Sequence, residues 1–236
     1  MTAQVDHLVV MAASLDQGVQ WCEATLGITP GPGGEHPLMG THNRLFSIAG
    51  PAFPRAYFEI IAIQPGVTPA RPPGKHRWFD MDDPVLQSRL SGEGPQLIHF
   101  VASVPGVVSA VKALAAQGLD RGAVVQASRQ TASALLSWRI TVRDDGQRLF
   151  YGGLPTLIQW GRASEDPARA AHPLDTMQAS GVTLEALRVS HPRPEKLQAG
   201  YDAIGLVGVT LAQGAPSLVA TLQTPRGRVQ LESKGI

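Results

Sequence analysis

The sequence has little of several features that identify common classes of protein. Among its 236 residues only Cys22 is a cysteine, so no disulfide can form within the chain. Its 20 basic and 19 acidic residues nearly balance, and no cluster of lysine and arginine offers a patch for phosphates or lipid headgroups. No stretch approaches the roughly 20 apolar residues that a membrane-spanning helix needs. We therefore expect neither a nucleic acid nor a membrane as a partner.

The beginning of the chain does not resemble a secretion signal. The apolar run at residues 8–11 is short, follows Asp6 and His7, and has no basic leader. Cys22 lies in an expected amphipathic helix, where a buried and unreactive thiol is the simplest interpretation. With 43% hydrophobic and 17% charged residues, the composition is that of a packed globular protein. We expect a cytoplasmic protein.

What the chain does contain is one pattern that occurs three times. Each copy has an apolar strand, a helix-start signal, an amphipathic helix, and then glycine followed by leucine or isoleucine. The expected helix boundaries are Ser14, with Gln17 completing a capping box, and Gly27; Pro105 and Gly118; and Pro192 or Pro194 and Gly205. The spacing from opening signal to glycine is about 13 residues each time, a common helix length.

Further strand-like runs follow each of these helices. The expected strands are 5–12, 44–48 and 57–63 in the first unit, 97–104, 122–127, 134–142 and 149–160 in the second, and 184–190, 207–211, 218–224 and 228–232 in the third. Each unit is therefore approximately βαβββ, which predicts an α+β fold. Two segments, 64–90 and 162–180, are rich in proline or alanine and are expected to connect the units.

Polar side chains interrupt the apolar strands at corresponding places. His7 and Glu59 do so in the first unit, and His99 and Gln159 in the second. An ionised carboxylate among apolar residues must be paired, metal-bound, hydrogen-bonded or solvated. Two imidazoles and one carboxylate are suitable ligands for Zn, Mn, Fe or Ni, with positions left for substrate oxygens. We predict a divalent-metal or ligand site at His7, Glu59 and His99, with Gln159 as a weaker fourth ligand; alternatively, these residues are hydrogen-bonded structural groups and Glu59 faces water.

The sequence also resembles a known family. The segments 36–45, 57–63 and 77–79 are similar to the glyoxalase-like domain family of the vicinal-oxygen-chelate superfamily, which includes glyoxalase I, extradiol dioxygenases and bleomycin-resistance proteins. The resemblance covers roughly residues 5–160. It implies a cupped mixed sheet made from two modules, with any metal held on the concave face.

The resemblance also assigns residues and boundaries. His7, Glu59 and His99 match the superfamily's metal positions, whereas Gln159 departs from the glutamate of bacterial glyoxalase I. The implied domain spans 1–163, with modules 4–64 and 95–161. The repeated pattern, not the resemblance, makes residues 181–236 a third βαβββ-like unit. Ala186 lies there where His99 lies in the second unit, so the third unit is expected to extend the sheet, cover one end of the cup or build a dimer interface.

Several other side chains are candidates for contact with a substrate. The glycine- and proline-rich loop before the second strand carries polar groups, two arginines could pair with a carboxylate, and two tryptophans could form an apolar wall. These residues are His36, His42, Asn43, Arg44, Arg77, Trp78 and Trp138. Turn formation, structural salt bridges and core packing explain them equally well.

Two kinds of function are consistent with these residues. The first is a metal-dependent lyase, isomerase or dioxygenase that acts on a small molecule with adjacent oxygens. The second is a metal-free protein of the bleomycin-resistance type that binds an apolar or aromatic compound in the same cup. A third alternative is a vestigial site in a protein that works by association, with a homodimer as one arrangement.

Overall fold

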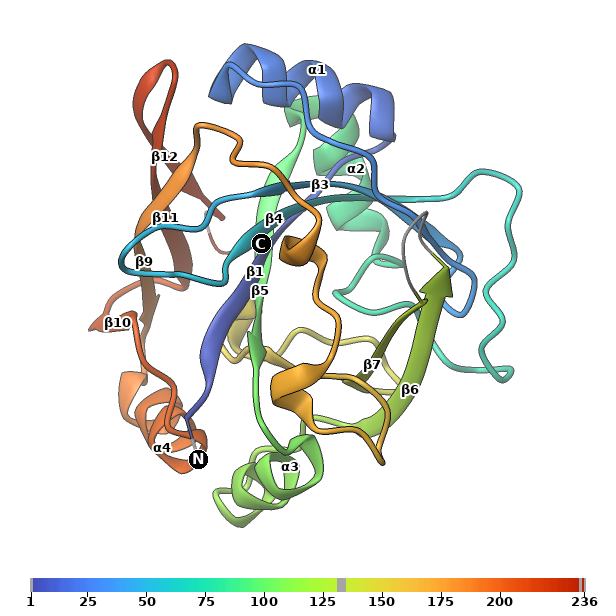
Figure 1. The fold of residues 1–236 in the computed structure, drawn as a ribbon. Coiled ribbons are helices and arrows are strands. Elements are labelled where there is room, and N and C mark those ends of the chain that lie inside the picture. The colour runs from blue at the N-terminus through green and yellow to red at the C-terminus, as the bar shows by residue number, and fades with distance from the viewer. Residues whose placement is uncertain (1, 131–134, 234, 236) are drawn as a thin grey trace.

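The computed structural model describes residues 2–130, 135–233 and 235, which form two β-sheets with helices packed around them (Figure 1). The eight strands of the larger sheet are β1 Gln4–Met11, β2 Glu35–His36, β3 Thr41–Ser47, β4 Tyr57–Ile63, β5 Gln96–Ser103, β6 Ala123–Gln130, β7 Leu135–Val142 and β8 Thr156–Trp160. The smaller sheet contains β9 Thr183–His191, β10 Val209–Gln213, β11 Ser217–Thr224 and β12 Gly227–Glu232.

The helices lie mostly at the periphery of the sheets. The α-helices are α1 Leu15–Leu26, α2 Pro84–Glu93, α3 Val107–Ala116 and α4 Pro194–Ile204, and the 3-10 turns are Phe150–Gly152, Pro167–Arg169 and Pro173–Asp175. As predicted, Ser14 caps α1 by accepting a hydrogen bond from the Gln17 amide, and Gly27 ends it in the left-handed conformation. Cys22 is buried, as predicted, and burial raises its thiol pKa to about 12. No helix in the described ranges is long and apolar enough to cross a membrane.

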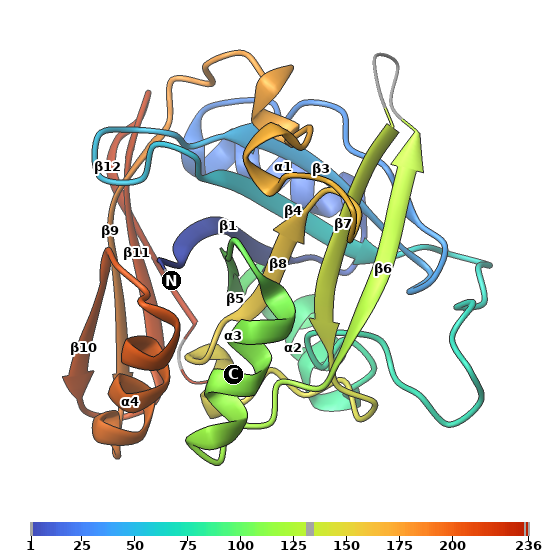
Figure 2. The same ribbon diagram turned by 60° about the horizontal axis from the view of Figure 1, so that its bottom comes forward.

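The larger sheet is built from two copies of one module. Its strand order is β2-β3-β4-β1-β5-β8-β7-β6, so each module places its last strand parallel to its first, and the two first strands meet antiparallel at the centre. The sheet curls around a concave face (Figure 2), and the residues of one hydrophobic cluster line that face. These features confirm the predicted α+β fold of repeated βαβββ modules.

A β-bulge near the start of β1 decides which side chains reach the concave face. The pairing of β1 with β5 shifts register between Val5 and His7, so no residue of β5 is paired with Asp6. Val5 and Leu8 both pack in the core on the outer face of the sheet, and Val9 packs in the concave cluster. Side chains of consecutive strand residues normally point to opposite faces of a sheet. At this bulge the side chains of Asp6 and His7 are instead hydrogen-bonded to each other.

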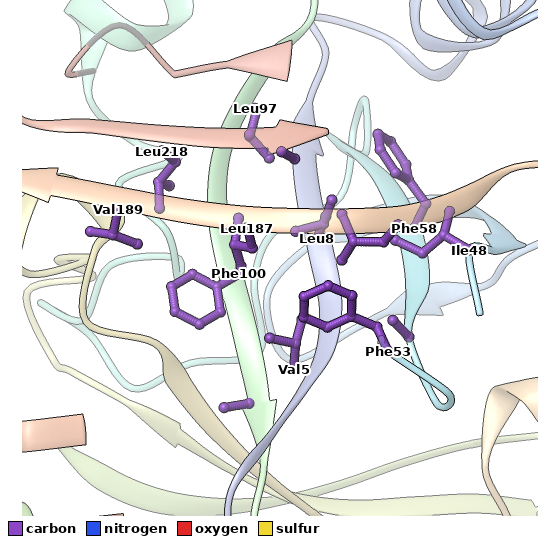
Figure 3. Packing of buried hydrophobic residues seen from close by; sticks show 14 of the residues in the cluster. Val5, Leu8, Ile48, Phe53, Phe58, Leu97, Phe100, Leu187, Val189 and Leu218 are labelled. Atoms are coloured by element: carbon purple, nitrogen blue, oxygen red, sulfur yellow. The ribbon is translucent and has the colours of Figure 1, made fainter. Parts of the chain in front are cut away.

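The third unit forms its own four-stranded sheet against the outer face of the first. Its strands carry Leu187, Val189 and Leu218 into the same core as Leu8 and Phe100 of the central strands (Figure 3). Its helix α4 packs beside α3. One of the predicted alternatives was that this unit extends the eight-stranded sheet, and it does not. It buries the outer surface of β1 and β5 instead.

Two predicted segments differ from the structure. Residues 64–90 were expected to be a plain connection, but Asp83 caps a helix that begins at Pro84. The expected strand at 149–160 begins only at Thr156, because Leu149 to Tyr151 adopt left-handed backbone angles and form a turn. The start of the expected strand at 134 lies outside the described residues.

Candidate functional site

The imidazole of His7 is held from behind by the carboxylate of Asp6. Nδ1 of His7 lies 2.7 Å from Oδ1 of Asp6, and both side chains are buried. Because an ionised carboxylate only accepts hydrogen bonds, His7 donates through Nδ1 and its Nε2 is the unprotonated nitrogen of the neutral ring. The ring is stacked on Tyr57 at 4.5 Å between centroids. Its orientation is therefore fixed on two sides.

Asp6 is the centre of a larger hydrogen-bonded group. Its Oδ2 accepts a hydrogen bond from the Trp160 indole at 2.8 Å and lies 3.3 Å from Nε2 of His172. Nδ1 of His172 accepts a hydrogen bond from the Leu174 amide, so its Nε2 is the donor to Asp6. Burial alone would raise the pKa of the Asp6 carboxyl, but the hydrogen bonds from His172 and His7 outweigh it and hold that pKa below the ordinary value. Asp6 is thus ionised wherever the protein is folded near neutral pH.

Glu59 faces His7 from the neighbouring strand β4. Its Oε2 lies 3.6 Å from Nε2 of His7, and its Oε1 accepts a hydrogen bond from the Asn43 amide at 2.6 Å. Oδ1 of Asn43 in turn accepts hydrogen bonds from the Gly34 amide and from Arg129. Two lone-pair-bearing atoms therefore face each other across a short gap, an arrangement that is favourable when a proton or another cation lies between them.

The pocket around this pair is small and has aromatic walls. Its free volume is about 30 Å³. Its lining includes His7, His36, Asn43, Tyr57, Glu59, Trp78, Phe79, Arg129, Trp138 and Trp160. Burial, together with the nearby charge of Arg129, lowers the pKa of His36 to about 3, so this histidine is neutral. Burial and the negative charges of Asp6 and Glu59 raise the pKa of Tyr57 well above its ordinary value, so its hydroxyl stays protonated.

The substrate candidates divide into two groups. His36, Asn43, Trp78 and Trp138 line the pocket. The other three do not line it: His42, Arg44 and Arg77. Arg44 is exposed on β3, where residues alternate with those that face the pocket. Arg77 is engaged in an ion pair with Asp82 at 2.6 Å.

His99 is not brought to His7 and Glu59. Its Nδ1 lies 3.0 Å from the carbonyl oxygen of Gly152, and its Nε2 accepts a hydrogen bond from the Thr156 amide at 3.1 Å. Both ring nitrogens are therefore engaged within the second module. Burial, with the charges of Arg121 and Arg148 nearby, holds the pKa of His99 well below its ordinary value.

Gln159 is also distant from the pair, and the strand register explains why. In the first module Val9, two residues after His7, lies opposite Glu59; in the second, Val101, two residues after His99, lies opposite Thr156. Thr156 is thus the counterpart of Glu59. The Gln159 side chain instead accepts a hydrogen bond from the Val107 amide at the start of α3.

The donor set fits only part of the predicted metal site. His7 and Glu59 could supply two ligands, and Asp6 and Asn43 orient them as outer partners do in metal sites. In the described part of the chain, however, no three His, Cys, Asp or Glu side chains are grouped as metal ligands. For the three-ligand site to form, His99 would have to give up its hydrogen bonds to Gly152 and Thr156 and move toward His7 and Glu59. The three-ligand site stays a prediction.

The comparisons with other proteins agree with the fold and the repeated module. A sequence profile described as a glyoxalase-like domain matches residues 5–205. The chain belongs to the glyoxalase-like domain family. This confirms the predicted resemblance, and the match continues beyond the two modules into the third unit of this glyoxalase-like protein. No curated protein sequence matches the chain significantly.

Solved structures are similar to this chain at low sequence identity, and one of them, with a TM-score above 0.5, shares its fold. A hypothetical protein from Staphylococcus aureus is 13% identical, with a TM-score of 0.57 over 98% of this chain and 85% of that one. Methylmalonyl-CoA epimerase from Mycobacterium tuberculosis is 16% identical, with a TM-score of 0.38 over 67% of this chain and 87% of that one. The Streptomyces coelicolor epimerase with 2-nitronate-propionyl-CoA is 15% identical, with a TM-score of 0.39 over 67% and 97%. Similarity this distant concerns the fold and says nothing about this chain's substrate.

Several residues of the glyoxalase-like site were not predicted. They are Asp6, Tyr57, Arg129, Trp160 and His172. Tyr57 could have been predicted from the sequence, because it lies two residues before Glu59 on one strand and therefore faces the same side of the sheet. The others depend on the bulge at Asp6 and on contacts between segments far apart in the chain.

Proposed function

We propose that this glyoxalase-like protein is an enzyme that binds a small oxygenated anion in the pocket and moves a proton at the carbon next to its carbonyl group, as lyases and isomerases do. The observation that supports this proposal is the Asp6–His7 pair, whose free Nε2 lies in a pocket that also contains Glu59 and Arg129. A buried carboxylate behind a histidine is an arrangement that favours proton acceptance at the other nitrogen.

Each group has a separate part in the proposed reaction. Arg129 pairs with the oxygens of the substrate, where a planar guanidinium can bind two of them. Nε2 of His7 takes the proton from carbon, and the electron pair left behind moves onto the carbonyl oxygen. The imidazolium that forms lies between the carboxylates of Asp6 and Glu59, which stabilise its charge. The proton then returns to the carbon skeleton, on either face or at a leaving group.

Metal dependence is a further part of the original prediction. A divalent ion at His7 and Glu59 would polarise adjacent substrate oxygens as a Lewis acid. Since the described residues offer only two ligands of the predicted three, we assign no step to a metal.

The test is solvent deuterium exchange into 2-oxobutanoate, followed by proton NMR, for wild type, His7→Ala and His42→Ala. Wild type should exchange the hydrogens next to the carbonyl faster than buffer, and His7→Ala should lower that rate by about 10²- to 10⁴-fold. His42→Ala, which removes an imidazole that does not line the pocket, should keep it. Equal rates in wild type and His7→Ala would contradict the proposal. Repeating the assay after chelation and after adding Zn, Mn, Fe or Ni measures any metal dependence.

The metal-free binding protein is the second candidate function. Five aromatic side chains around a single small pocket favour it, since such walls also suit a tightly held apolar ligand; they are Tyr57, Trp78, Phe79, Trp138 and Trp160. It predicts saturable binding with no enzyme-dependent exchange of carbon-bound hydrogen. The exchange experiment therefore separates the two functions directly.

A further inference from the structure

A second pocket lies directly beside the one that contains His7. It lies between the loop that follows β2 and the strands β6 and β7, and its free volume is about 200 Å³. The two pockets share four lining residues, which are His36, Trp78, Trp138 and Ile140. We call the pocket with His7 the head pocket and the second one the side pocket.

The lining of the side pocket differs in character from that of the head pocket. Leu38, Met39 and Ala127 contribute apolar surface, and Met39 is fully buried. The polar side chains of Glu35, Gln126 and Ser128 are exposed, which places them at the rim. The head pocket, by contrast, contains Glu59 and Arg129. The head pocket is therefore lined by charged groups, and the buried part of the side pocket is lined mainly by apolar ones.

The boundary between the two pockets is made of rings held in place by one another. His36 meets the edges of Trp78 and Trp138, with centroids 5.2 Å and 6.3 Å away. Trp78 is also stacked on Phe79 at 5.1 Å. Because the pKa of His36 is lowered to about 3, the ring between the tryptophans is neutral and adds no charge to the boundary.

One polar group at this boundary has no protein partner. The indole nitrogen of Trp78 is buried and makes no hydrogen bond to any described residue. A buried N–H group without an acceptor destabilises the folded protein, and an oxygen of a bound molecule would supply that acceptor. Trp78 lines both pockets, so a ligand that spans them lies against its side chain.

We infer that the substrate has two parts: an oxygenated anionic head bound near His7 and Arg129, and an aryl or branched alkyl tail bound in the side pocket. This inference rests on the proposed function. An apolar tail suits the side pocket because its buried lining is apolar, and an aromatic tail gains ring contacts with Trp78 and Trp138. A head without a tail would leave this surface uncovered.

The test compares two acids that share one head. Isothermal titration measures the binding of 2-oxobutanoate and of 2-oxo-4-phenylbutanoate to wild type, Ala127→Phe and Ala123→Phe. Ala127 lines the side pocket and lies opposite Trp138, so a phenylalanine there fills the space for the tail. Ala123 is an exposed alanine on the same strand and serves as the matched control.

Wild type should bind the phenyl acid about 10- to 100-fold more tightly, which is the range expected for burying a phenyl ring. Ala127→Phe should abolish this preference with little effect on 2-oxobutanoate, and Ala123→Phe should keep it. Equal affinity for both acids in wild type, or a preference that survives in Ala127→Phe, would overturn the tail inference while binding of 2-oxobutanoate leaves the proposed function standing. Binding of neither acid would overturn both.

Discussion

Asp6 determines which nitrogen of His7 can accept a proton. As a carboxylate it fixes the hydrogen on Nδ1 and leaves Nε2 free. Replacing it with asparagine puts an amide at the same place, whose NH₂ group can donate to Nδ1 and so favour the opposite tautomer. The role of Asp6 is to position His7, because His7 lies between it and the pocket.

We therefore expect Asp6→Asn to lower the turnover number in the exchange assay by about 10²- to 10⁴-fold while the KM changes little. Asp16→Asn, at an exposed aspartate on α1, is the matched control and should behave as wild type. A change in KM with an unaltered turnover number would show that Asp6 acts on binding instead. Urea unfolding of both variants establishes that they are folded.

His36 should make the protein less stable in acid. Its pKa is about 3 in the folded protein and 6.5 when unperturbed, so between these values the unfolded chain binds a proton that the folded protein does not. The free energy of unfolding therefore falls as pH falls through this window, by up to about 1.4 kcal/mol per pH unit for one such group. Asp6 adds to this loss only below its ordinary pKa of 3.8.

Urea unfolding between about pH 7 and pH 4 measures this slope. His36→Gln removes one titrating group and should make the dependence less steep, with the buried His99 still contributing, whereas His76→Gln, at a side chain that is 58% exposed, should leave it as in wild type. An equal slope in wild type and His36→Gln would mean that His36 is not held neutral.

At the scale of single residues, the sequence was informative about polar groups inside apolar strands. His7 and Glu59 were predicted together, and they face each other in the structure. Their partners were not predictable, because Asp6 joins them only through a bulge and His172 reaches them from a segment 166 residues away in the chain. Gln159 was misaligned by three residues, since flanking apolar residues alone do not fix the register of a strand.

Among the elements, α1 shows how packing overrides intrinsic helix preference. Gly18 lies inside this helix and faces β4, where an added Cβ would come within 2.4 Å of Cγ2 of Ile60. Helix propensity alone predicts that alanine would stabilise the helix by about 1 kcal/mol. Overpacking against a buried strand lowers the free energy of unfolding by about 1–3 kcal/mol. A cost of this size is expected here, because 2.4 Å is far shorter than a van der Waals contact.

Gly18→Ala should therefore lower the free energy of unfolding, by up to about 2 kcal/mol, in chemical denaturation. Gly92→Ala is the control, because it lies in helix α2 with nothing within 4 Å of its added Cβ, and it should stabilise the protein slightly. A Gly18→Ala variant more stable than wild type would mean that the contact between α1 and β4 relaxes without cost.

The elements that the sequence predicted best are those with capping signals. Ser14 and Gly27 bound α1 as expected, and Gly205 ends α4. Helix α2 was missed although Asp83 and Pro84 form a helix start, because the surrounding prolines indicated a loop. The turn at 149–151 was missed because nothing in Leu-Phe-Tyr signals left-handed backbone angles.

For the whole molecule, the third unit matters because it shares a core with the two modules. Leu187 of β9 is 1% exposed and packs in the cluster that contains Leu8 and Phe100 (Figure 3). The sequence predicted the elements of this unit but not its place, since a βαβββ pattern does not specify which surface it covers. Two sheets joined by one core should unfold together.

Leu187→Ala should accordingly destabilise the entire protein by about 2–5 kcal/mol, with the tryptophan fluorescence of the pocket and the far-UV signal lost in one transition. Val207→Ala, at a valine that is 54% exposed, is the control and should have little effect. A separate early transition that leaves the tryptophan signal intact would contradict the shared core.

We propose above all that a small oxygenated anion binds against His7 in the pocket formed by the two modules. The most direct measurement is ¹⁵N NMR of the histidine rings as 2-oxobutanoate is added. We expect that the ring signals of His7 and His36, which line the pocket, shift in a saturable way, while those of His42 and His76 do not. Saturable shifts confined to histidines outside the pocket, or no shift at His7 when the acid is bound, would contradict it.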